Sequence, residues 1–278
     1  MIIKAYAKIN LTLDIVGILP NGFHGLRSIM APVSLCDHIT IEKSNTLQFD
    51  CNIKSLCSDD NLCIRAANAF FQESGISERV SIYLQKNIPF PAGLGGGSAD
   101  AAAILKGLNS LFGNPLTQQQ LFNLGAKLGS DVPICMHGSV ALCEGRGEIL
   151  TPLSGVPKLN IVIAIGGERL STPLVFKAYD NANLPVQNDT DNFITALGQS
   201  DTTALINACG NAFEPVVDKL CPETTQIRNQ LLTLGALNAR LSGSGPSVYG
   251  IFQTESDAVN AVTQLQNMGY SAYNCKIM

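Results

Sequence analysis

The spacing of apolar residues along the chain changes repeatedly between the period of a β-strand and that of an α-helix. Residues 2–16 are rich in Ile, Leu, Val and Thr, which predicts a long strand at the start. Apolar residues recur at helical spacing over about 60–74, and Gly75 follows, so a helix is expected there. Further strands are expected at about 27–34, 38–43, 46–53 and 80–85.

The middle of the chain contains a helix signal followed by a sharp break. Thr117 and Gln120 have the spacing of a capping box, which predicts a helix that continues to about residue 128. In the segment 129–133, Ser130 is expected to cap a short helical turn with Asp131 at its positive end. Strands at about 139–143 and 147–151 are expected to form a hairpin.

A cluster of proline and glycine at about 152–157 marks a change in composition, and we place a domain boundary there. The predicted domains are residues 1–155 and 156–278. In the second, strands are expected at about 159–165, 237–241, 247–252 and 271–277, and helices at about 171–183, 190–198, 201–208, 212–219, 223–234 and 256–268. This order of elements predicts a two-layer α+β fold with an antiparallel sheet.

Residues 91–98, here called the glycine loop, hold four glycines in five positions and run into an alanine-rich helix expected from about Ser98. Glycine lets backbone N–H groups approach a ligand, and a helix N-terminus adds free N–H groups and partial positive charge. This combination predicts a phosphate site, although a flexible loop before a buried helix is an alternative. The loop lacks the Gly-Lys-[Ser/Thr] ending of a Walker A loop and the glycine spacing of a dinucleotide fingerprint.

Two other positions are candidates for chemistry. Lys8 and Asn10 lie two apart in the first predicted strand, so their side chains are expected on one face. Solvated polar residues are the alternative explanation for this pair. Asp131 is either a simple capping residue or an acid near the predicted phosphate site.

Composition limits the class of protein. The chain has 278 residues, 46% of them apolar and 14% charged, which indicates one large or two moderate globular domains. A net charge of −4 without a basic cluster argues against a nucleic-acid or membrane-surface binder. The nine cysteines form no Cys-x-x-Cys pair, so we expect reduced thiols and no zinc site. With neither a signal peptide nor a membrane-length apolar run, the protein is expected to be soluble and cytoplasmic.

Three stretches, in order along the chain, resemble the signature regions of the GHMP kinases (galactokinase, homoserine kinase, mevalonate kinase and phosphomevalonate kinase). They are the first strand with Lys8 and Asn10, residues 91–103, and residues 241–247. The resemblance spans nearly the whole chain. It implies an N-terminal ATP-binding domain and a C-terminal substrate-side domain, divided near residue 155.

The match is densest to one branch of the family, at residues 5–11, 21–24, 93–98, 128–133 and 145–148. That branch phosphorylates the 2-hydroxyl of a cytidine-diphosphate-linked methylerythritol in the non-mevalonate route to isoprenoid precursors. The resemblance therefore implies a small-molecule kinase with ATP and Mg²⁺, the metal being held by phosphates and waters. Another kinase of the family, acting on homoserine or a mevalonate-type substrate, remains an alternative, as does a non-catalytic nucleotide-binding relative.

The resemblance also implies roles for single residues. Asp131 is implied to be the base that takes the proton from the substrate hydroxyl, and Lys8 to hold that carboxylate and the incoming phosphate. A nearby lysine keeps an aspartate ionised at neutral pH, as a base must be. The implied ATP-binding positions are Asn61, near adenine, and Pro91, Ala92, Gly93, Leu94, Gly95, Gly96, Gly97, Ser98, Ala99, Asp100 and Ala101.

On the substrate side, the resemblance implies that His24 reads the edge of the cytosine while Phe23 and Phe176 sandwich its ring. Asn10 and Thr172 are implied to contact the methylerythritol and diphosphate, and the backbone of Gly243, Ser244 and Gly245 to form a further wall. The chain departs from the branch at three positions. They are Phe23 in place of tyrosine, Ala99 in place of a second serine, and Ala212 in place of the aspartate usual in the Asn-Ala-Phe-Glu stretch 211–214. No role is assigned to position 212.

Overall fold

The computed structural model describes all 278 residues, which fall into two compact units. The first unit comprises Met1–Ala7, Leu35–Pro89 and Gly95–Gly138. The second comprises Lys8–Ser34, Phe90–Leu94 and Ser139–Met278. Strands β1 (Ile2–Asn10) and β3 (His24–Ser44) contribute residues to both units. The compact units thus divide the chain at other points than residue 155, and the two-domain division drawn there stays a prediction.

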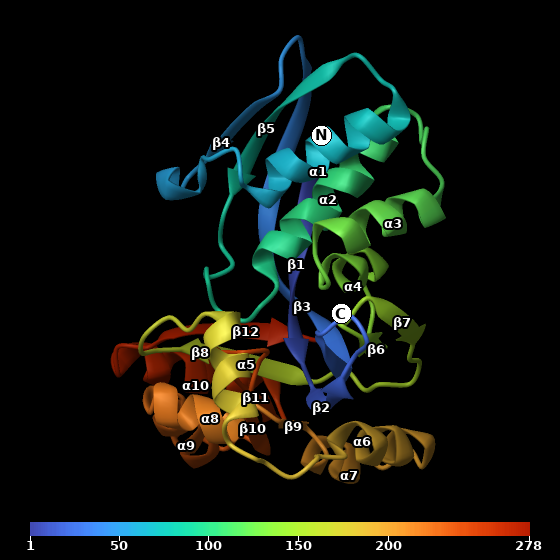
Figure 1. The fold of residues 1–278 in the computed structure, drawn as a ribbon. Coiled ribbons are helices and arrows are strands. Elements are labelled where there is room, and N and C mark those ends of the chain that lie inside the picture. The colour runs from blue at the N-terminus through green and yellow to red at the C-terminus, as the bar shows by residue number, and fades with distance from the viewer. The chain divides into compact units, whose positions relative to one another are not determined.

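The first unit packs helices against a small sheet. Strand β5 (Arg79–Gln85) pairs antiparallel with the later part of β3 and parallel with β4 (Gln48–Cys51). The helices are α1 (Leu62–Ser74), α2 (Gly96–Leu111), α3 (Gln118–Leu128) and the short α4 (Val132–His137), with a 3-10 turn at Lys54–Leu56. Figure 1 shows α1, α2 and α3 beside one another. Their apolar faces and the sheet share one buried core that includes Ile39, Phe70 and Leu105.

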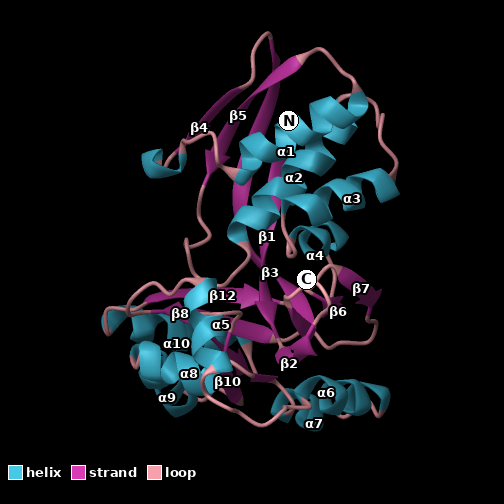
Figure 2. Ribbon diagram, viewed as in Figure 1, coloured by secondary structure: helices cyan, strands magenta, loops and turns pink.

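The second unit contains part of an eight-stranded sheet, to which β4 and β5 of the first unit also belong through β3, and a separate four-stranded sheet (Figure 2). In one, β2 (Thr12–Ile18) and β6 (Ala141–Gly145) both pair antiparallel with β3, β7 (Ile149–Pro152) extends β6, and β9 (Gly210–Asn211) pairs parallel with β2. The other is antiparallel throughout, in the order β10 (Asn238–Leu241), β11 (Val248–Phe252), β8 (Asn160–Ile165) and β12 (Ser271–Lys276). This four-stranded sheet confirms the predicted antiparallel α+β architecture.

Helices α9 (Glu223–Thr233) and α10 (Glu255–Asn267) pack on the four-stranded sheet. The remaining helices of the second unit are α5 (Thr172–Asp180), α6 (Asp189–Gly198), α7 (Thr202–Asn207) and α8 (Glu214–Leu220). The core contains Val162, Val217 and Leu265, all fully buried. Burial of these apolar faces is the main source of stability in a unit of this kind.

Local sequence signals located several helix ends correctly. Gly75 ends α1 in the left-handed conformation, with φ of 69°. Both hydrogen bonds of the Thr117–Gln120 capping box are present at the start of α3. At α4 the N-cap residue is Asp131 and not Ser130, and the Asp131 side chain makes no capping bond to the helix.

Two strand predictions differ from the structure. The single strand expected over 2–16 is two strands, separated at Leu11, whose carbonyl accepts hydrogen bonds from the Gly210 N–H and the Tyr249 hydroxyl. The two strands expected at 27–34 and 38–43 are one continuous strand, β3. The polar segment between them stays in the strand because the carboxylate of Asp37 is buried against Lys86.

None of the nine cysteines forms a disulfide bond, and six of them are buried. No helix combines the length and the apolar character that crossing a lipid bilayer requires. No group of three or more His, Cys, Asp or Glu side chains is arranged to hold a metal ion.

Candidate functional site

The glycine loop passes from the second unit into the first. Gly93 and Gly95 have φ of 74° and 65°, in the left-handed region that favours glycine. Helix α2 begins at Gly96, two residues earlier than expected, with Gly95 as its N-cap. The first N–H groups of this 16-residue helix therefore follow the loop directly, as an anion site requires.

Within the second unit, Gly93 lies against the turn formed by residues 242–247, here called the second glycine turn. The Ser242 hydroxyl donates to the Gly93 carbonyl at 3.2 Å. A Cβ atom on Gly93 would collide with the Ser242 carbonyl oxygen, so only glycine fits there. Two glycine-rich stretches about 150 residues apart in the chain are thus in direct contact.

Lys8 and Asn10 lie on one face of β1, as predicted, and both are buried. The Lys8 Nζ donates to the Asn10 Oδ1 at 2.9 Å, and the Asn10 Nδ2 donates to the Ser28 hydroxyl at 2.8 Å. The Lys8 N–H donates to the Leu94 carbonyl at 3.0 Å, which ties β1 to the glycine loop. A Cβ on Gly243 would lie 3.6 Å from the Asn10 Oδ1. The three stretches that carry the family resemblance therefore meet in the second unit.

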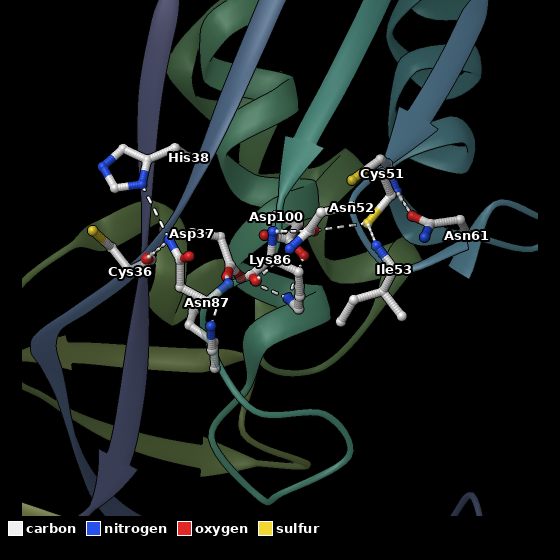
Figure 3. Close-up of polar contacts among 12 residues, drawn as sticks. Cys36, Asp37, His38, Cys51, Asn52, Ile53, Asn61, Lys86, Asn87 and Asp100 are labelled. Carbon is white, nitrogen blue, oxygen red and sulfur yellow. Dashed lines mark hydrogen bonds and ion pairs between the residues drawn. The ribbon is translucent and has the colours of Figure 1, made fainter. Parts of the chain in front are cut away.

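In the first unit, a buried lysine holds the start of α2. The Lys86 Nζ lies 2.6 Å from a carboxylate oxygen of Asp37 and 2.6 Å from one of Asp100, which stands in the first part of α2 (Figure 3). The other Asp37 oxygen accepts from the N–H groups of Asn87 and Ile88, at 2.5 and 2.7 Å. A Cβ on Gly96 would lie only 3.0 Å from the Lys86 Nζ. Asp37 and Lys86 thus fix the residues that follow β5, and Lys86 also fixes the start of α2 through Asp100.

Burial controls the ionisation of this cluster. It raises the pKa of Asp100 to about 8, although the Lys86 charge acts in the opposite direction. Burial alone would lower the pKa of Lys86, but the two carboxylates outweigh it and the pKa is raised. The carboxylate of Asp100 faces inward to Lys86, and its N–H lies within α2, beyond the free N–H groups of the first turn. Sequence reasoning missed Lys86 and Asp37 because nothing local links residues 49 positions apart.

Asn61 and Asp131 also belong to the first unit. Asn61 is the N-cap of α1: its Oδ1 accepts from the Cys63 N–H at 2.8 Å, and its Nδ2 donates to the Leu56 carbonyl at 2.9 Å. Asp131 directly precedes α4, which packs against α2. A Cβ on the neighbouring Gly129 would lie 3.8 Å from the Ser98 hydroxyl. The segment that carries Asp131 is therefore next to the first turn of α2.

The predicted cytidine-facing residues are in the second unit. His24, at the start of β3, stacks on Phe176 with ring centroids 4.5 Å apart. The His24 Nε2 lies 2.7 Å from a carboxylate oxygen of Asp180, a residue that sequence reasoning missed. Phe176 and Asp180 are four positions apart on α5 and therefore lie on one face of that helix. Phe176 stacks on the face of the His24 ring, and Asp180 contacts its edge.

Phe23 does not lie on Phe176 in this structure. Its side chain is 56% exposed, and the Arg146 guanidinium lies over its ring at 5.3 Å from the centroid. The face of Phe176 that stacks on His24 is occupied by that imidazole. A base held between Phe23 and Phe176 therefore requires these rings to rearrange, and the sandwich stays a prediction.

Thr172 and the second glycine turn are in contact. The Thr172 hydroxyl, at the start of α5, lies 3.0 Å from the Ser244 hydroxyl. The turn contains Gly243 and Gly245, with φ of 57° and 75°. Thr172 thus contacts the second glycine turn through Ser244, which is partly exposed, whereas Gly243 and Gly245 are buried.

Two models of known protein families match the chain. The model described as GHMP kinases N terminal domain matches residues 61–139, and the model described as GHMP kinases C terminal matches residues 193–271. These matches lie on either side of residue 155.

Individual relatives match over nearly the full length. The 4-diphosphocytidyl-2-C-methyl-D-erythritol kinase of Caldicellulosiruptor saccharolyticus is 40% identical over 269 residues, which cover 96% of this chain and 93% of the relative. A crystal structure of 4-(cytidine 5'-diphospho)-2C-methyl-D-erythritol kinase aligns with a TM-score of 0.87 and 32% identity, over 100% of this chain and 99% of the other. Homoserine kinase from Cytophaga hutchinsonii, with a TM-score of 0.74 and 18% identity over 100% of this chain and 94% of its own, shares the fold.

Proposed function

Because this chain belongs to the GHMP kinase family, we propose that it transfers a phosphate from ATP to the 2-hydroxyl of 4-diphosphocytidyl-2-C-methyl-D-erythritol. This reaction is a step of the non-mevalonate route to isoprenoid precursors. The observation that carries the proposal is 40% identity, over 96% of the chain, to a kinase named for that substrate. The homoserine kinase, in contrast, shares the fold at 18% identity.

The glycine loop and the start of α2 suit the phosphates of ATP. Gly93 and Gly95 keep side chains away from the backbone, and the helix N-terminus provides free N–H groups. We assign the phosphates to residues 93–101 and adenine to the neighbourhood of Asn61. ATP supplies the transferred phosphate, and Mg²⁺ bound to it neutralises phosphate charge. The metal is assigned to phosphates and waters, and no protein ligand is proposed.

Lys8 and Asp131 are the proposed catalytic residues. Phosphoryl transfer depends mainly on positioning and on stabilising charge, which a buried lysine such as Lys8 provides. Its Nζ is oriented by Asn10, and its backbone is tied to Leu94 of the glycine loop. Asp131, beside the first turn of α2, is assigned as the base that takes the proton of the substrate hydroxyl.

The cytidine end of the substrate is assigned to Phe23, His24 and Phe176. Aromatic rings stack on bases, with about 1–3 kcal/mol per stacked base, and an imidazole can bond to a base edge. Asn10 and Thr172 are assigned to the methylerythritol and diphosphate. The second glycine turn, in contact with Thr172, is assigned as a further wall of the site.

A substrate panel tests this function. The purified chain is incubated with ATP, Mg²⁺ and one acceptor at a time: the cytidyl compound, homoserine or mevalonate, and release of ADP is measured. We expect the cytidyl compound to give the highest kcat/KM. Preference for homoserine or mevalonate would instead favour another activity of the family. ATP binding without ADP release for any acceptor would indicate a non-catalytic relative.

We further propose that the protein works in the cytoplasm. Buried free thiols such as those of Cys51, Cys63 and Cys209 support this location, because reducing compartments keep thiols in that state. Fluorescence from a tagged chain that is confined to another compartment would contradict the assignment.

A further inference from the structure

Two side chains of the stretch 211–214, Asn-Ala-Phe-Glu, form hydrogen bonds with the backbone at the second glycine turn. Asn211 ends β9 and is 2% exposed. Its Nδ2 donates to two backbone carbonyls, that of Leu241 just before the turn at 3.0 Å and that of Gly243 within the turn at 2.9 Å. Its Oδ1 accepts from the Phe213 N–H at 2.9 Å. Both amide hydrogens and the amide oxygen are therefore engaged, which fixes the orientation of the side chain.

The hydrogen bond from Asn211 to the Gly243 carbonyl determines the direction of the Ser244 N–H. The peptide between Gly243 and Ser244 is trans, so its N–H and C=O point in opposite directions. Because the Gly243 carbonyl faces Asn211, the Ser244 N–H faces away from Asn211. The N–H groups of Ser242 and Gly245 are used within the turn, donating to Ser247 at 2.9 Å and to Ser242 at 3.0 Å.

Glu214 holds the same strand end from a second direction. Its Oε1 accepts from the Leu241 N–H at 2.9 Å, while Asn211 binds the carbonyl of the same residue. The other carboxylate oxygen of Glu214 lies 2.8 Å from an Arg228 nitrogen. The Glu214 and Arg228 side chains are only 15% and 14% exposed, so the carboxylate has little freedom to move. Leu241 is thus fixed at both backbone polar groups, immediately before the turn.

We propose that Asn211 and Glu214 are positioning residues that fix the second glycine turn. In this position the Ser244 N–H donates to an anionic oxygen of the diphosphate that the acceptor substrate carries. The inference rests on the proposed function, which assigns the turn to the substrate side. Neither residue touches the substrate; each acts through the backbone of Leu241 or Gly243. A shift of about 1 Å in such a group can lower catalysis by about 10²-fold.

A matched pair of variants tests this role. Asn238 is also a buried asparagine: its Nδ2 donates to the Ile206 carbonyl at 2.6 Å, and its Oδ1 accepts from the Ala239 N–H at 2.8 Å. Asn211→Ala and Asn238→Ala remove the same kind of group, but only Asn211 contacts the turn. The melting temperature is measured for each, together with kcat and the separate KM values for ATP and the cytidyl compound.

We expect both variants to lower the melting temperature, and Asn211→Ala alone to raise the KM for the cytidyl compound, by about 10- to 10²-fold, the range for one hydrogen bond to a charged group. The KM for ATP should stay at the wild-type value in both. Equal acceptor KM values in the two variants, or an equal rise for ATP and acceptor in Asn211→Ala, would overturn the proposal. If the wild type prefers another acceptor, the proposed function fails, and the same comparison is made with that acceptor.

If Asn211→Ala does not fold, variants of Glu214 test the proposal instead. Glu214→Gln keeps an oxygen that accepts from the Leu241 N–H, whereas Glu214→Ala removes it. We expect Glu214→Ala to raise the acceptor KM and Glu214→Gln to recover most of that loss. Similar acceptor KM values in the two variants would contradict a role for this hydrogen bond.

Discussion

The ammonium group of Lys86 and the carboxylate of Asp100 lie 2.6 Å apart in the interior of the first unit. Asp37 lies at the same distance on the same ammonium, so two acids share one base. Removing charges from water is costly unless they are paired, and one lysine neutralises only one of the two carboxylates. The charge of this group of three residues, Lys86, Asp37 and Asp100, here called the Lys86 cluster, therefore depends on pH. The cluster lies where α2 begins.

The first prediction concerns the stability of the folded chain as pH rises. Burial raises the pKa of Asp100 from 3.8 to about 8, so the folded protein keeps a proton that the unfolded chain releases above about pH 4. The stabilising contribution of Asp100 is therefore complete below pH 4 and is lost as pH rises to about 8. The slope is at most about 1.4 kcal/mol per pH unit. Asp100→Asn, which cannot ionise, should lack this component.

Urea unfolding at pH 5, 7 and 9 measures the effect. The free energy of unfolding of the wild type minus that of Asp100→Asn should fall from pH 5 to pH 7 and further from pH 7 to pH 9. Asp50→Asn is the control, because Asp50 is exposed and its pKa is lowered by Lys54, so its titration lies below this range. If this difference in the free energy of unfolding between wild type and Asp100→Asn is the same at all three pH values, Asp100 is ionised throughout the range.

The second prediction concerns the proposed base. Asp131→Asn keeps the shape of the side chain but cannot take a proton, so we expect kcat to fall by about 10²–10⁴-fold. The affinity for ATP should be nearly unchanged, because the glycine loop is expected to bind ATP through its backbone. Lys8→Ala should likewise lose rate more than nucleotide affinity. Steady-state kinetics together with calorimetric titration of ATP measure both quantities.

Asp59→Asn serves as the control for this experiment. Asp59 is an exposed aspartate of the same unit, and it has no assigned role. It should retain wild-type kcat. Wild-type turnover in Asp131→Asn would remove Asp131 from the mechanism and with it the assignment of the base.

Prediction from sequence succeeded where the determining contacts are local. Gly75 and the Thr117–Gln120 pair each act within one helix turn, so the sequence pattern alone was sufficient. The Lys86 cluster joins residues 49 and 14 positions apart, and no local pattern reports such a pairing. Motif resemblance pointed to the glycine loop, but it gave no indication that Lys86 and Asp37 lie behind the start of α2.

The substrate side shows the same limit. His24 and Phe176 were singled out through resemblance, but Asp180 enters only because α5 brings it to the edge of the imidazole. The role inferred for Asn211 likewise depends on contacts with residues 30 and 32 positions away. Supporting side chains of this kind are set by tertiary structure, and the sequence pattern around them is unremarkable.

The third prediction concerns Asp180 and recognition of the base. An Asp180 oxygen that accepts from the His24 Nε2–H leaves Nδ1 to meet the ligand, so the carboxylate sets the imidazole tautomer. Asp180→Ala should raise the KM for the cytidyl compound by about 10-fold, equivalent to about 1.4 kcal/mol, the scale of one hydrogen bond. The KM for ATP should not change.

Asp191→Ala is the matched control. Asp191 is also an exposed aspartate paired with a residue of β3, its carboxylate lying 2.7 Å from an Arg27 nitrogen. It should leave both KM values at the wild-type level. Nitrogen chemical shifts of His24 provide an independent readout, and an unchanged tautomer in Asp180→Ala would contradict the role of the carboxylate.

The last prediction separates backbone strain from contact at Gly93. Gly75 and Gly93 have nearly the same φ, 69° and 74°, but a Cβ on Gly75 meets nothing within 4 Å, whereas one on Gly93 collides with the Ser242 carbonyl. Gly75→Ala should therefore cost about 1–2 kcal/mol of unfolding free energy from the left-handed backbone alone. Gly93→Ala should cost more than Gly75→Ala, since the second glycine turn must also move. It should also lower kcat/KM, which Gly75→Ala should not do. Equal losses of stability with unchanged kinetics in both variants would mean that the contact between the glycine loop and the second glycine turn is not needed for activity.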